Sequence, residues 1–152
     1  MTRRIPRLLA RSPIPLYRMG LGFLFGRRLA MLEHVGRVSG RRRYVVLESL
    51  EHDAHGLVVV SGYGGESQWY RNVVAHPQVR VWTGWRRGVQ ATAEVVPATE
   101  VPRRLEEYRR RHRRAAKALG RTLDLPDLAG DGPLREDVGL RLPLIRIEFG
   151  SA

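Results

Sequence analysis

The central stretch of the sequence reads Gly36-Arg37-Val38-Ser39-Gly40-Arg41-Arg42-Arg43. An apolar run, 29–35, precedes it, and a run rich in β-branched residues, 44–50, follows it. Two strands joined by such a turn form a β-hairpin, in which the glycines supply the backbone freedom that a turn requires. Backbone amides of glycine and guanidinium groups of arginine are also the donors that hold a phosphate. The pattern therefore leaves two interpretations open: an ordinary hairpin with solvated arginines, or a phosphate-binding turn.

The composition indicates one globular domain spanning residues 1–152. Hydrophobic residues make up 43% of the chain and charged residues 28%, which is typical of a folded domain with a core. The chain has no cysteine, so disulfides, thiolate metal sites and thiol nucleophiles are excluded. Its five histidines are scattered and show no metal-ligand spacing, so we expect no metal centre.

The chain is strongly basic, with a net charge of +12 from 27 basic and 15 acidic residues. Every basic residue except Lys117 is an arginine. Such a balance suits an anionic ligand, a nucleic acid or an acidic membrane surface. A nucleic-acid-binding module is therefore a rival hypothesis, but the sequence carries no recognisable nucleic-acid motif and no aromatic residues interleaved with its basic run. We expect no nucleic-acid partner.

Residues 1–28 are predicted to form an N-terminal helical extension. Apolar residues recur at helical spacing between Ile14 and Phe25, and Pro15 suits the first turn of a helix. No stretch reaches the ~20 apolar residues of a membrane-spanning helix. An amphipathic helix of this kind either packs on the domain or makes peripheral contact with a membrane. The expected location is the cytoplasm, with membrane association as an open alternative.

The remaining sequence predicts about six strands and two helices. The strands are expected at 29–35, 44–50, 57–60, 78–83, 89–96 and 142–149. A short helix over 66–75 follows the third strand, and a longer helix from Thr99 to about residue 119 precedes an irregular loop, 120–139, and the last strand. Short strands in quick succession predict a mainly β fold, a mostly antiparallel meander or barrel, rather than a βαβ unit. The arginine-rich run 109–114 is expected to be a solvated helix face.

A second notable stretch is the glycine-rich loop Ser61-Gly62-Tyr63-Gly64-Gly65 and the short helix that follows it. In one interpretation the loop simply enters a helix whose Trp69 belongs to the core. In the other, the glycine amides approach a flat heterocycle such as a flavin-like ring, and Tyr63, Trp69 and Asn72 pack against it or bind its polar edge.

Together the two stretches resemble the deazaflavin-dependent nitroreductase family. GRVSGRRR at 36–43 matches that family's G-R-x-S-G-x-x-R pattern, and VVVSGYGGESQWYRNVVAHP at 58–77 matches its (S/G)-x-G-G and W-Y-x-N-x-x-x-x-P patterns. The resemblance runs from about residue 13 to residue 97, with a looser match through the final strand. It implies a split β-barrel related to flavin-reductase-like proteins.

The resemblance also implies a cofactor, coenzyme F420, in preference to FMN. This coenzyme is an 8-hydroxy-5-deazaflavin with a phosphate and an oligoglutamate tail, and its reduced form transfers a hydride to a small electron-poor acceptor such as a quinone, an activated alkene or a nitro compound. The positions that match the phosphate-binding turn are Arg37, Ser39, Gly40, Arg41 and Arg43. The positions that match the ring-binding loop and helix are Ser61, Gly62, Tyr63, Gly64, Trp69 and Asn72.

Two further residues are candidates for a catalytic role, Glu48 and Tyr63. Glu48 lies in the middle of a predicted strand, where a carboxylate either faces solvent or an arginine, or faces the cofactor and orients the substrate or relays a proton. His34 and His76 are expected to be structural. The main rival to an oxidoreductase is a non-catalytic binder of a deazaflavin, a flavin or another hydrophobic ligand, because fold does not fix function. In either case we expect a monomer or a homodimer.

Overall fold

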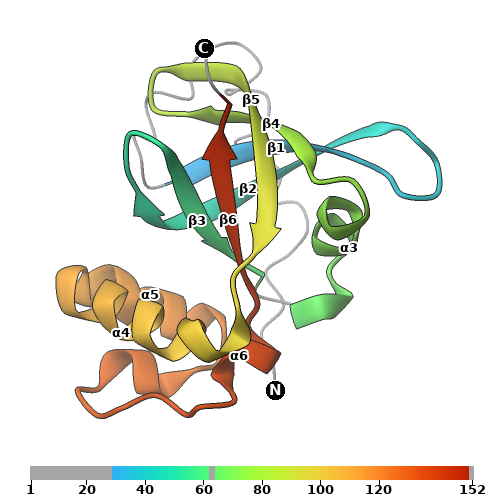
Figure 1. Cartoon of the computed structure of the whole chain (residues 1–152). Helices are drawn as coiled ribbons and strands as arrows, with labels where there is room; N and C mark the ends of the chain where they lie inside the picture. Colours follow the sequence, from blue (N-terminus) through green and yellow to red (C-terminus); the bar gives the residue numbers. More distant parts are fainter. Residues whose placement is uncertain (1–28, 62–63, 151–152) are drawn as a thin grey trace.

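A closed barrel of six antiparallel strands forms the centre of the computed structural model, which describes residues 29–61 and 64–150 (Figure 1). The strands are β1 (Leu29–Val35), β2 (Arg42–His52), β3 (Gly56–Val60), β4 (Gln78–Thr83), β5 (Arg86–Val95) and β6 (Leu144–Phe149). Their hydrogen-bonded order is β1-β2-β3-β6-β5-β4, and β1 closes the ring by pairing with β4. The predicted mainly β fold with about six antiparallel strands is confirmed.

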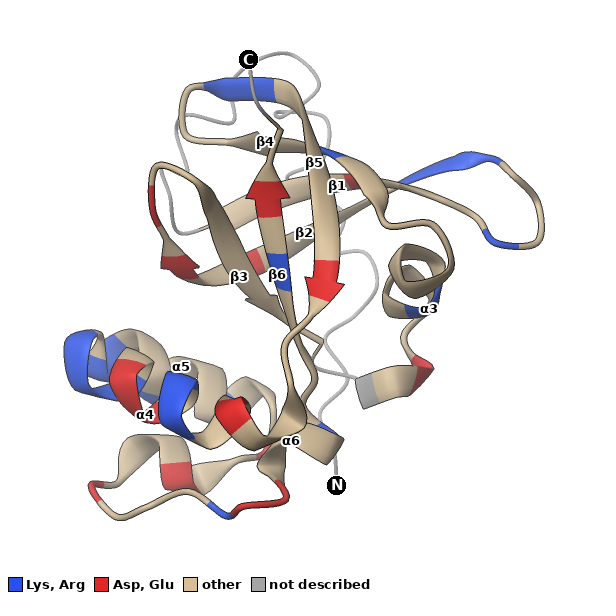
Figure 2. Ribbon diagram, in the orientation of Figure 1, with Lys and Arg blue, Asp and Glu red and all other residues tan. Residues whose placement is uncertain are grey.

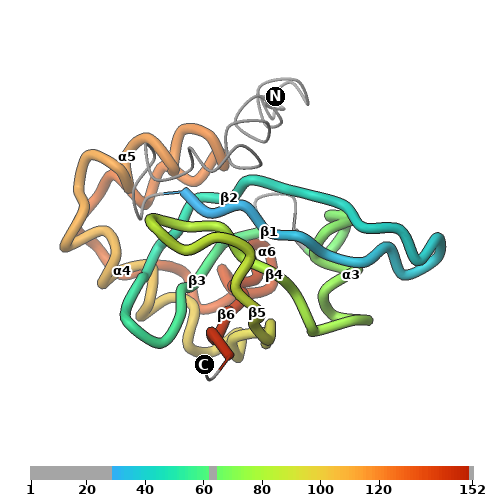
Figure 3. Tube along the Cα trace, turned by 90° about the horizontal axis from the view of Figure 1, so that it is seen from above, coloured from blue at the N-terminus to red at the C-terminus, as the bar shows by residue number. Residues whose placement is uncertain are grey.

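Helices pack at two places around the barrel (Figures 1 and 3). A single-turn 3-10 helix, η2 (Gly64–Glu66), leads into α3 (Gln68–Ala75), which lies beside the β1–β2 hairpin. The other helical segments form a cap next to the opposite end of β2, and they follow β5 in the chain. They are η3 (Ala98–Glu100), α4 (Val101–Arg111), α5 (Arg113–Thr122), η4 (Pro126–Ala129) and α6 (Val138–Arg141).

The strands alternate between two hydrophobic clusters, as period-2 side-chain geometry requires. One cluster fills the barrel and includes Leu32, Val59 and Ile147, with Trp69 and Val73 of α3 packed against it. The other cluster lies between the outer face of β2, β3 and β6 and the helical cap, and it includes Leu50, Val58 and Leu144. The barrel is therefore apolar on its inside and also on the part of its outside that the cap covers.

The helical cap differs from the prediction in two respects. The single helix expected from Thr99 to about residue 119 is broken at His112, whose backbone leaves the helical region at φ −133° and ψ 63°. The break lets both halves bury an apolar stripe in the same cluster, through Leu105 on α4 and Leu119 on α5. Residues 120–139, predicted as an irregular loop, contain the end of α5, η4 and the start of α6.

The N-terminal helix predicted within 1–28 lies outside the described residues. Within the part of the chain that the structure describes, no helix has the length and apolar character needed to cross a bilayer.

Candidate functional site

The Gly36–Arg43 stretch is a hairpin turn that extends beyond the barrel beside α3 (Figures 1 and 3). The β1–β2 ladder ends at the pair Val35 and Arg42, and the turn continues it with a hydrogen bond from the Gly36 amide to the Arg41 carbonyl, 2.9 Å. Gly40 has φ +69°, a left-handed conformation that favours glycine. The predicted hairpin is therefore present, and Gly40 occupies a position whose backbone conformation favours glycine.

Gly36 packs closely against two side chains of its own turn. A Cβ at residue 36 would lie 2.5 Å from the Ser39 hydroxyl oxygen and 3.3 Å from Nε of Arg43. A side chain larger than hydrogen would therefore displace the hydroxyl and crowd the guanidinium. The hydroxyl of Ser39 and the guanidinium of Arg43 therefore lie on the same side of the turn, next to Gly36, and both groups are donors that an anion can use.

The turn is fastened to α3 by a buried amide. Asn72, only 2% exposed, accepts hydrogen bonds at Oδ1 from the backbone amide of Arg37, 3.1 Å, and from its Nη1, 2.9 Å. Arg37 also donates through Nη2 to Oε1 of Gln68, one helical turn earlier on α3, at 3.0 Å. The structure thus brings Arg37 and Asn72, two of the predicted site residues, into direct contact.

The other half of the Asn72 amide contacts His34. Nδ2 of Asn72 lies 3.1 Å from Nδ1 of His34, and since the amide nitrogen donates, the imidazole accepts at Nδ1 and carries its proton on Nε2. Burial of His34, together with the nearby positive charge of Arg43, lowers the pKa of His34 from 6.5 to about 4. His34 is therefore neutral at neutral pH and fixes the orientation of the Asn72 amide.

Three consecutive arginines, Arg41 to Arg43, lie exposed on the hairpin, and Figure 2 shows basic residues on both arms of its tip. Nε of Arg42 lies 4.0 Å from a carboxylate oxygen of Glu33, a long and solvent-screened ion pair. The guanidinium groups of Arg41 and Arg43 make no hydrogen bond or ion pair with any residue that the structure describes. These two side chains are available for an anionic ligand.

The second predicted half-site is described in part. Ser61 is fully buried, and its backbone amide donates to the carbonyl of Pro143 at 2.9 Å. Gly62 and Tyr63 lie outside the described residues, and Gly64 begins η2. Arg71 of α3 holds this loop through a hydrogen bond from Nε to the Gly65 carbonyl, 3.2 Å.

Trp69 lies in the core of the barrel. It is 7% exposed, belongs to the interior cluster and meets the ring of Tyr70 edge-on at a centroid distance of 6.3 Å. The packing of Trp69 therefore agrees with the interpretation that this side chain belongs to the hydrophobic core.

A protein-family comparison covers most of this chain, including both half-sites. The sequence profile of the F420H(2)-dependent quinone reductase family matches residues 17–122. The chain belongs to this family. The prediction of a deazaflavin-dependent oxidoreductase is thereby confirmed at the level of the family, and it is favoured over the rival hypotheses of a non-catalytic binder and a nucleic-acid module. No curated protein matches the sequence.

Solved structures of low sequence identity share the fold of this family member. A protein of unknown function from Agrobacterium tumefaciens is 18% identical with a TM-score of 0.53, and the match covers 97% of this chain and 57% of that one. A structure described as a domain-swapped dimer is 21% identical with a TM-score of 0.53, covering 90% and 100% of the two chains. The heme storage protein from Vibrio cholerae is 16% identical with a TM-score of 0.52, covering 94% and 92%.

Glu48 lies apart from the turn in this quinone reductase family member. It pairs with Leu29, at the opposite end of the β1–β2 ladder from Val35 and Arg42. Its carboxylate faces the helical cap, where Oε1 accepts a hydrogen bond from the hydroxyl of Tyr108 at 3.1 Å. The structure therefore does not bring Glu48 together with the residues predicted for the cofactor, and one partner of its carboxylate is the hydroxyl of Tyr108.

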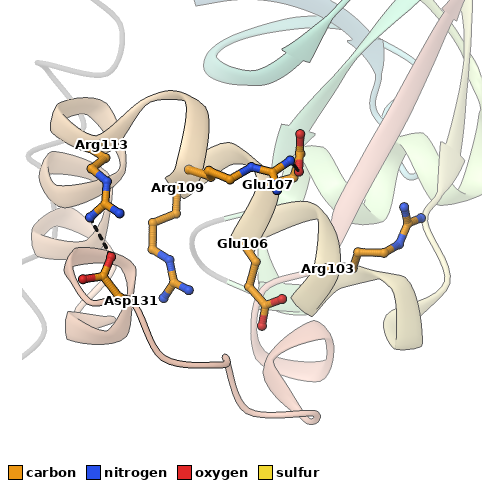
Figure 4. Close-up of a pocket in the computed structure, with 7 residues that line it drawn as sticks. Arg103, Glu106, Glu107, Arg109, Arg113 and Asp131 are labelled. Carbon is orange, nitrogen blue, oxygen red and sulfur yellow. Dashed lines mark hydrogen bonds and ion pairs between the residues drawn. The ribbon is translucent and has the colours of Figure 1, made fainter.

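The hollows in the helical cap are also remote from the predicted cofactor residues. One, of about 360 Å³, lies between α4, α5 and the loop after η4, and it is lined by charged side chains including Arg109, Arg113 and Asp131 (Figure 4). The other, of about 410 Å³, lies between α5 and η4. Neither is lined by the hairpin turn or by α3.

The prediction that the arginine-rich run 109–114 is a solvated helix face is wrong for Arg109. Arg109 is 8% exposed and donates to two loop carbonyls, from Nη1 to Asp127 at 2.9 Å and from Nη2 to Gly132 at 2.7 Å. It is buried because the loop 126–134 folds back over α4.

Two residues that were not among the predicted site residues contact the turn–helix junction, His34 and Gln68. The sequence contains a signal for each. Period-2 alternation along β1 places His34 on the barrel-facing side with Ala30 and Leu32, and Gln68 precedes Asn72 by four residues, which is one helical turn.

The residues present fit the cofactor that the family name implies. A phosphate-bearing deazaflavin requires charged donors at one end and an apolar support at the other. The turn offers the Ser39 hydroxyl and the guanidiniums of Arg41 and Arg43, which have no partner among the described residues, and the interior cluster of the barrel lies next to α3.

Proposed function

We propose that this chain binds coenzyme F420 and uses its reduced form to reduce a small electron-poor acceptor, with quinones as the leading class. The observation that carries the proposal is the family match over residues 17–122, which spans both the turn and α3. Activated alkenes and nitro compounds are further acceptors of the same electronic kind. The guanidiniums of Arg41 and Arg43, which have no partner in the part of the chain that the structure describes, support an anionic cofactor.

The chain's own residues have positioning roles in this proposal. Arg41 and Arg43, with Ser39 and the Gly40 backbone, hold the phosphate, and the loop from Ser61 to Gly64 lies against the ring. The predictions that Arg37, Trp69 and Asn72 contact the cofactor directly and that Tyr63 or Glu48 is catalytic remain untested. When bound, the reduced deazaflavin supplies the hydride. The protein then has to align donor and acceptor and exclude water, which explains a site without an evident nucleophile.

The decisive experiment is a titration of the purified chain with oxidised coenzyme F420, followed by fluorescence quenching, with FMN as the comparator. We expect saturable binding that weakens steeply with salt, because the ligand is a polyanion and the turn is cationic. Preference for FMN, or no quenching, would contradict the cofactor assignment. Quinone-dependent oxidation of the reduced coenzyme, compared with enone and nitroaromatic acceptors, then tests the reaction.

Arg43→Ala is expected to weaken binding of the oxidised coenzyme by about 1.5–3 kcal/mol, the loss of a charged hydrogen bond to the phosphate. The matched control is Arg87→Ala, which removes an exposed arginine near the start of β5 and should leave affinity within about 0.3 kcal/mol after correction for net charge. Equal losses for the two variants would show that only overall charge matters and that Arg43 is solvated.

The assembly state and location follow as separate proposals. We propose a monomer or homodimer, which light scattering of the purified chain distinguishes; one structure of this fold is described as a domain-swapped dimer. A cytoplasmic location and peripheral membrane contact through residues 1–28 stay predictions, and vesicle flotation of the full chain tests the second of them.

A further inference from the structure

The amide of Asn72 has almost no capacity left for a ligand. A carboxamide oxygen accepts at two lone pairs, and both are used by Arg37, through its backbone amide and Nη1. One of the two amide hydrogens is directed at Nδ1 of His34. With the side chain 2% exposed, a single N–H is all that Asn72 has to offer.

Arg37 is similarly committed. Its backbone amide and both terminal nitrogens are engaged with acceptors on α3, Oδ1 of Asn72 and Oε1 of Gln68. Its neighbours on the turn are in the opposite situation, since the guanidiniums of Arg41 and Arg43 have no partner among the described residues. Of the four arginines in 36–43, Arg37 therefore ties the turn to the helix, Arg42 lies 4.0 Å from Glu33, and the remaining two have no partner among the described residues.

We propose that Asn72 is a positioning residue: through Arg37 it fixes the hairpin turn against α3, so that Ser39 and Arg43 are held in place for the phosphate, and it does not contact the cofactor itself. The part of this inference that concerns the phosphate rests on the proposed cofactor function, whereas the fastening of the turn to α3 does not depend on it. His34 completes the arrangement by orienting the amide so that its oxygen faces Arg37.

Two substitutions at residue 72 separate positioning from direct contact. Asn72→Asp keeps an oxygen acceptor for Arg37 but removes both N–H donors, the one directed at His34 and the one left for a ligand. Asn72→Ala removes the acceptor as well as the donors. Val74→Ala, on the exposed face of the same helix, is the matched control. Arg37→Ala removes the side-chain part of the same connection, to Asn72 and Gln68, and leaves the buried amide of Asn72 and its hydrogen bond from the backbone of residue 37 intact.

The first measurement is hydrogen exchange of the Arg37 backbone amide by NMR, without any cofactor. We expect protection in the natural chain, in Asn72→Asp and in Val74→Ala, and faster exchange in Asn72→Ala. Unchanged exchange in Asn72→Ala would overturn the fastening role. This measurement needs no cofactor, so it tests the fastening of the turn independently of the proposed function. If the natural chain failed to bind coenzyme F420, the proposed function would be contradicted, and the exchange rates would still test the fastening.

The second measurement is the Kd for oxidised coenzyme F420. Asn72→Ala and Arg37→Ala are expected to weaken binding about tenfold, whereas Asn72→Asp stays within about threefold of the natural chain. The effects of Asn72→Ala and Arg43→Ala should be less than additive in the double variant, because a displaced turn has already lost the Arg43 contact. Loss of affinity in Asn72→Asp equal to that in Asn72→Ala, with the Arg37 amide still protected, would show a direct contact and overturn the proposal.

Discussion

Arg109→Leu is expected to lower the free energy of unfolding by about 3–4 kcal/mol, the largest effect of any substitution considered for this chain. The guanidinium is buried and donates to the carbonyls of Asp127 and Gly132, at 2.9 and 2.7 Å. Leucine fills much of the same space but leaves both carbonyls without a donor. The same helix also holds the loop through Glu106, whose Oε1 accepts from the Leu134 amide at 2.9 Å.

The measurement is urea denaturation at neutral pH, read as a change in midpoint at constant slope. Arg110→Leu is the matched control, because Arg110 is the next residue on α4, is 73% exposed and, among the described residues, pairs with Glu107 on the same helix; its loss should be within about 0.5 kcal/mol. Equal destabilisation by the two substitutions would contradict the buried role of Arg109 and agree with the sequence-based prediction that the run 109–114 is a solvated helix face.

The free energy of unfolding is expected to fall by about 3 kcal/mol more in the natural chain than in His34→Gln as the pH drops from about 6.5 to about 4. Burial and the charge of Arg43 hold the folded-state pKa of His34 near 4, below its ordinary value of 6.5. Between these two pH values the His34 imidazole is protonated in the unfolded chain but stays neutral in the folded chain. Acidification therefore favours unfolding, and the stability that His34 contributes is complete above pH 6.5 and lost towards pH 4.

Glutamine keeps an oxygen acceptor for Nδ2 of Asn72 but does not titrate, so the difference between the two pH profiles isolates His34 from all carboxylates. His76→Gln is the control, since that histidine is exposed at the end of α3. Parallel profiles for the natural chain and His34→Gln would contradict the lowered pKa of His34. A direct check is the titration of the His34 imidazole by NMR.

The strands were predictable from sequence because their signal is local. The alternation in β1 and the turn residues that follow it predicted the bounds Leu29–Val35, and those of β4 were equally accurate. The helical cap was not, because its form depends on what it packs against. Nothing local in 109–114 distinguishes a long helix from two short ones, whereas a break at His112 lets both halves reach the same apolar cluster.

The candidate site was predictable to a similar degree. Sequence pattern and family resemblance identified Arg37, Arg43 and Asn72, yet they did not show that Arg37 is bound to Asn72 and that Arg43 is not. That difference depends on the distance between a hairpin and a helix more than thirty residues apart in the chain. For Arg109 a signal was present, since it follows Leu105 by four residues and so shares the buried stripe of α4.

The closure of the barrel has a consequence for how copies of this chain can associate. Every strand of the described barrel has a hydrogen-bonded neighbour on both sides, because β1 pairs with β2 and with β4. An exposed sheet edge is the usual template for strand addition and for aggregation into extended sheets. With the ring closed, the described barrel offers another molecule no strand edge to extend, so we expect copies of this chain to associate through side chains or to open the ring and exchange a segment.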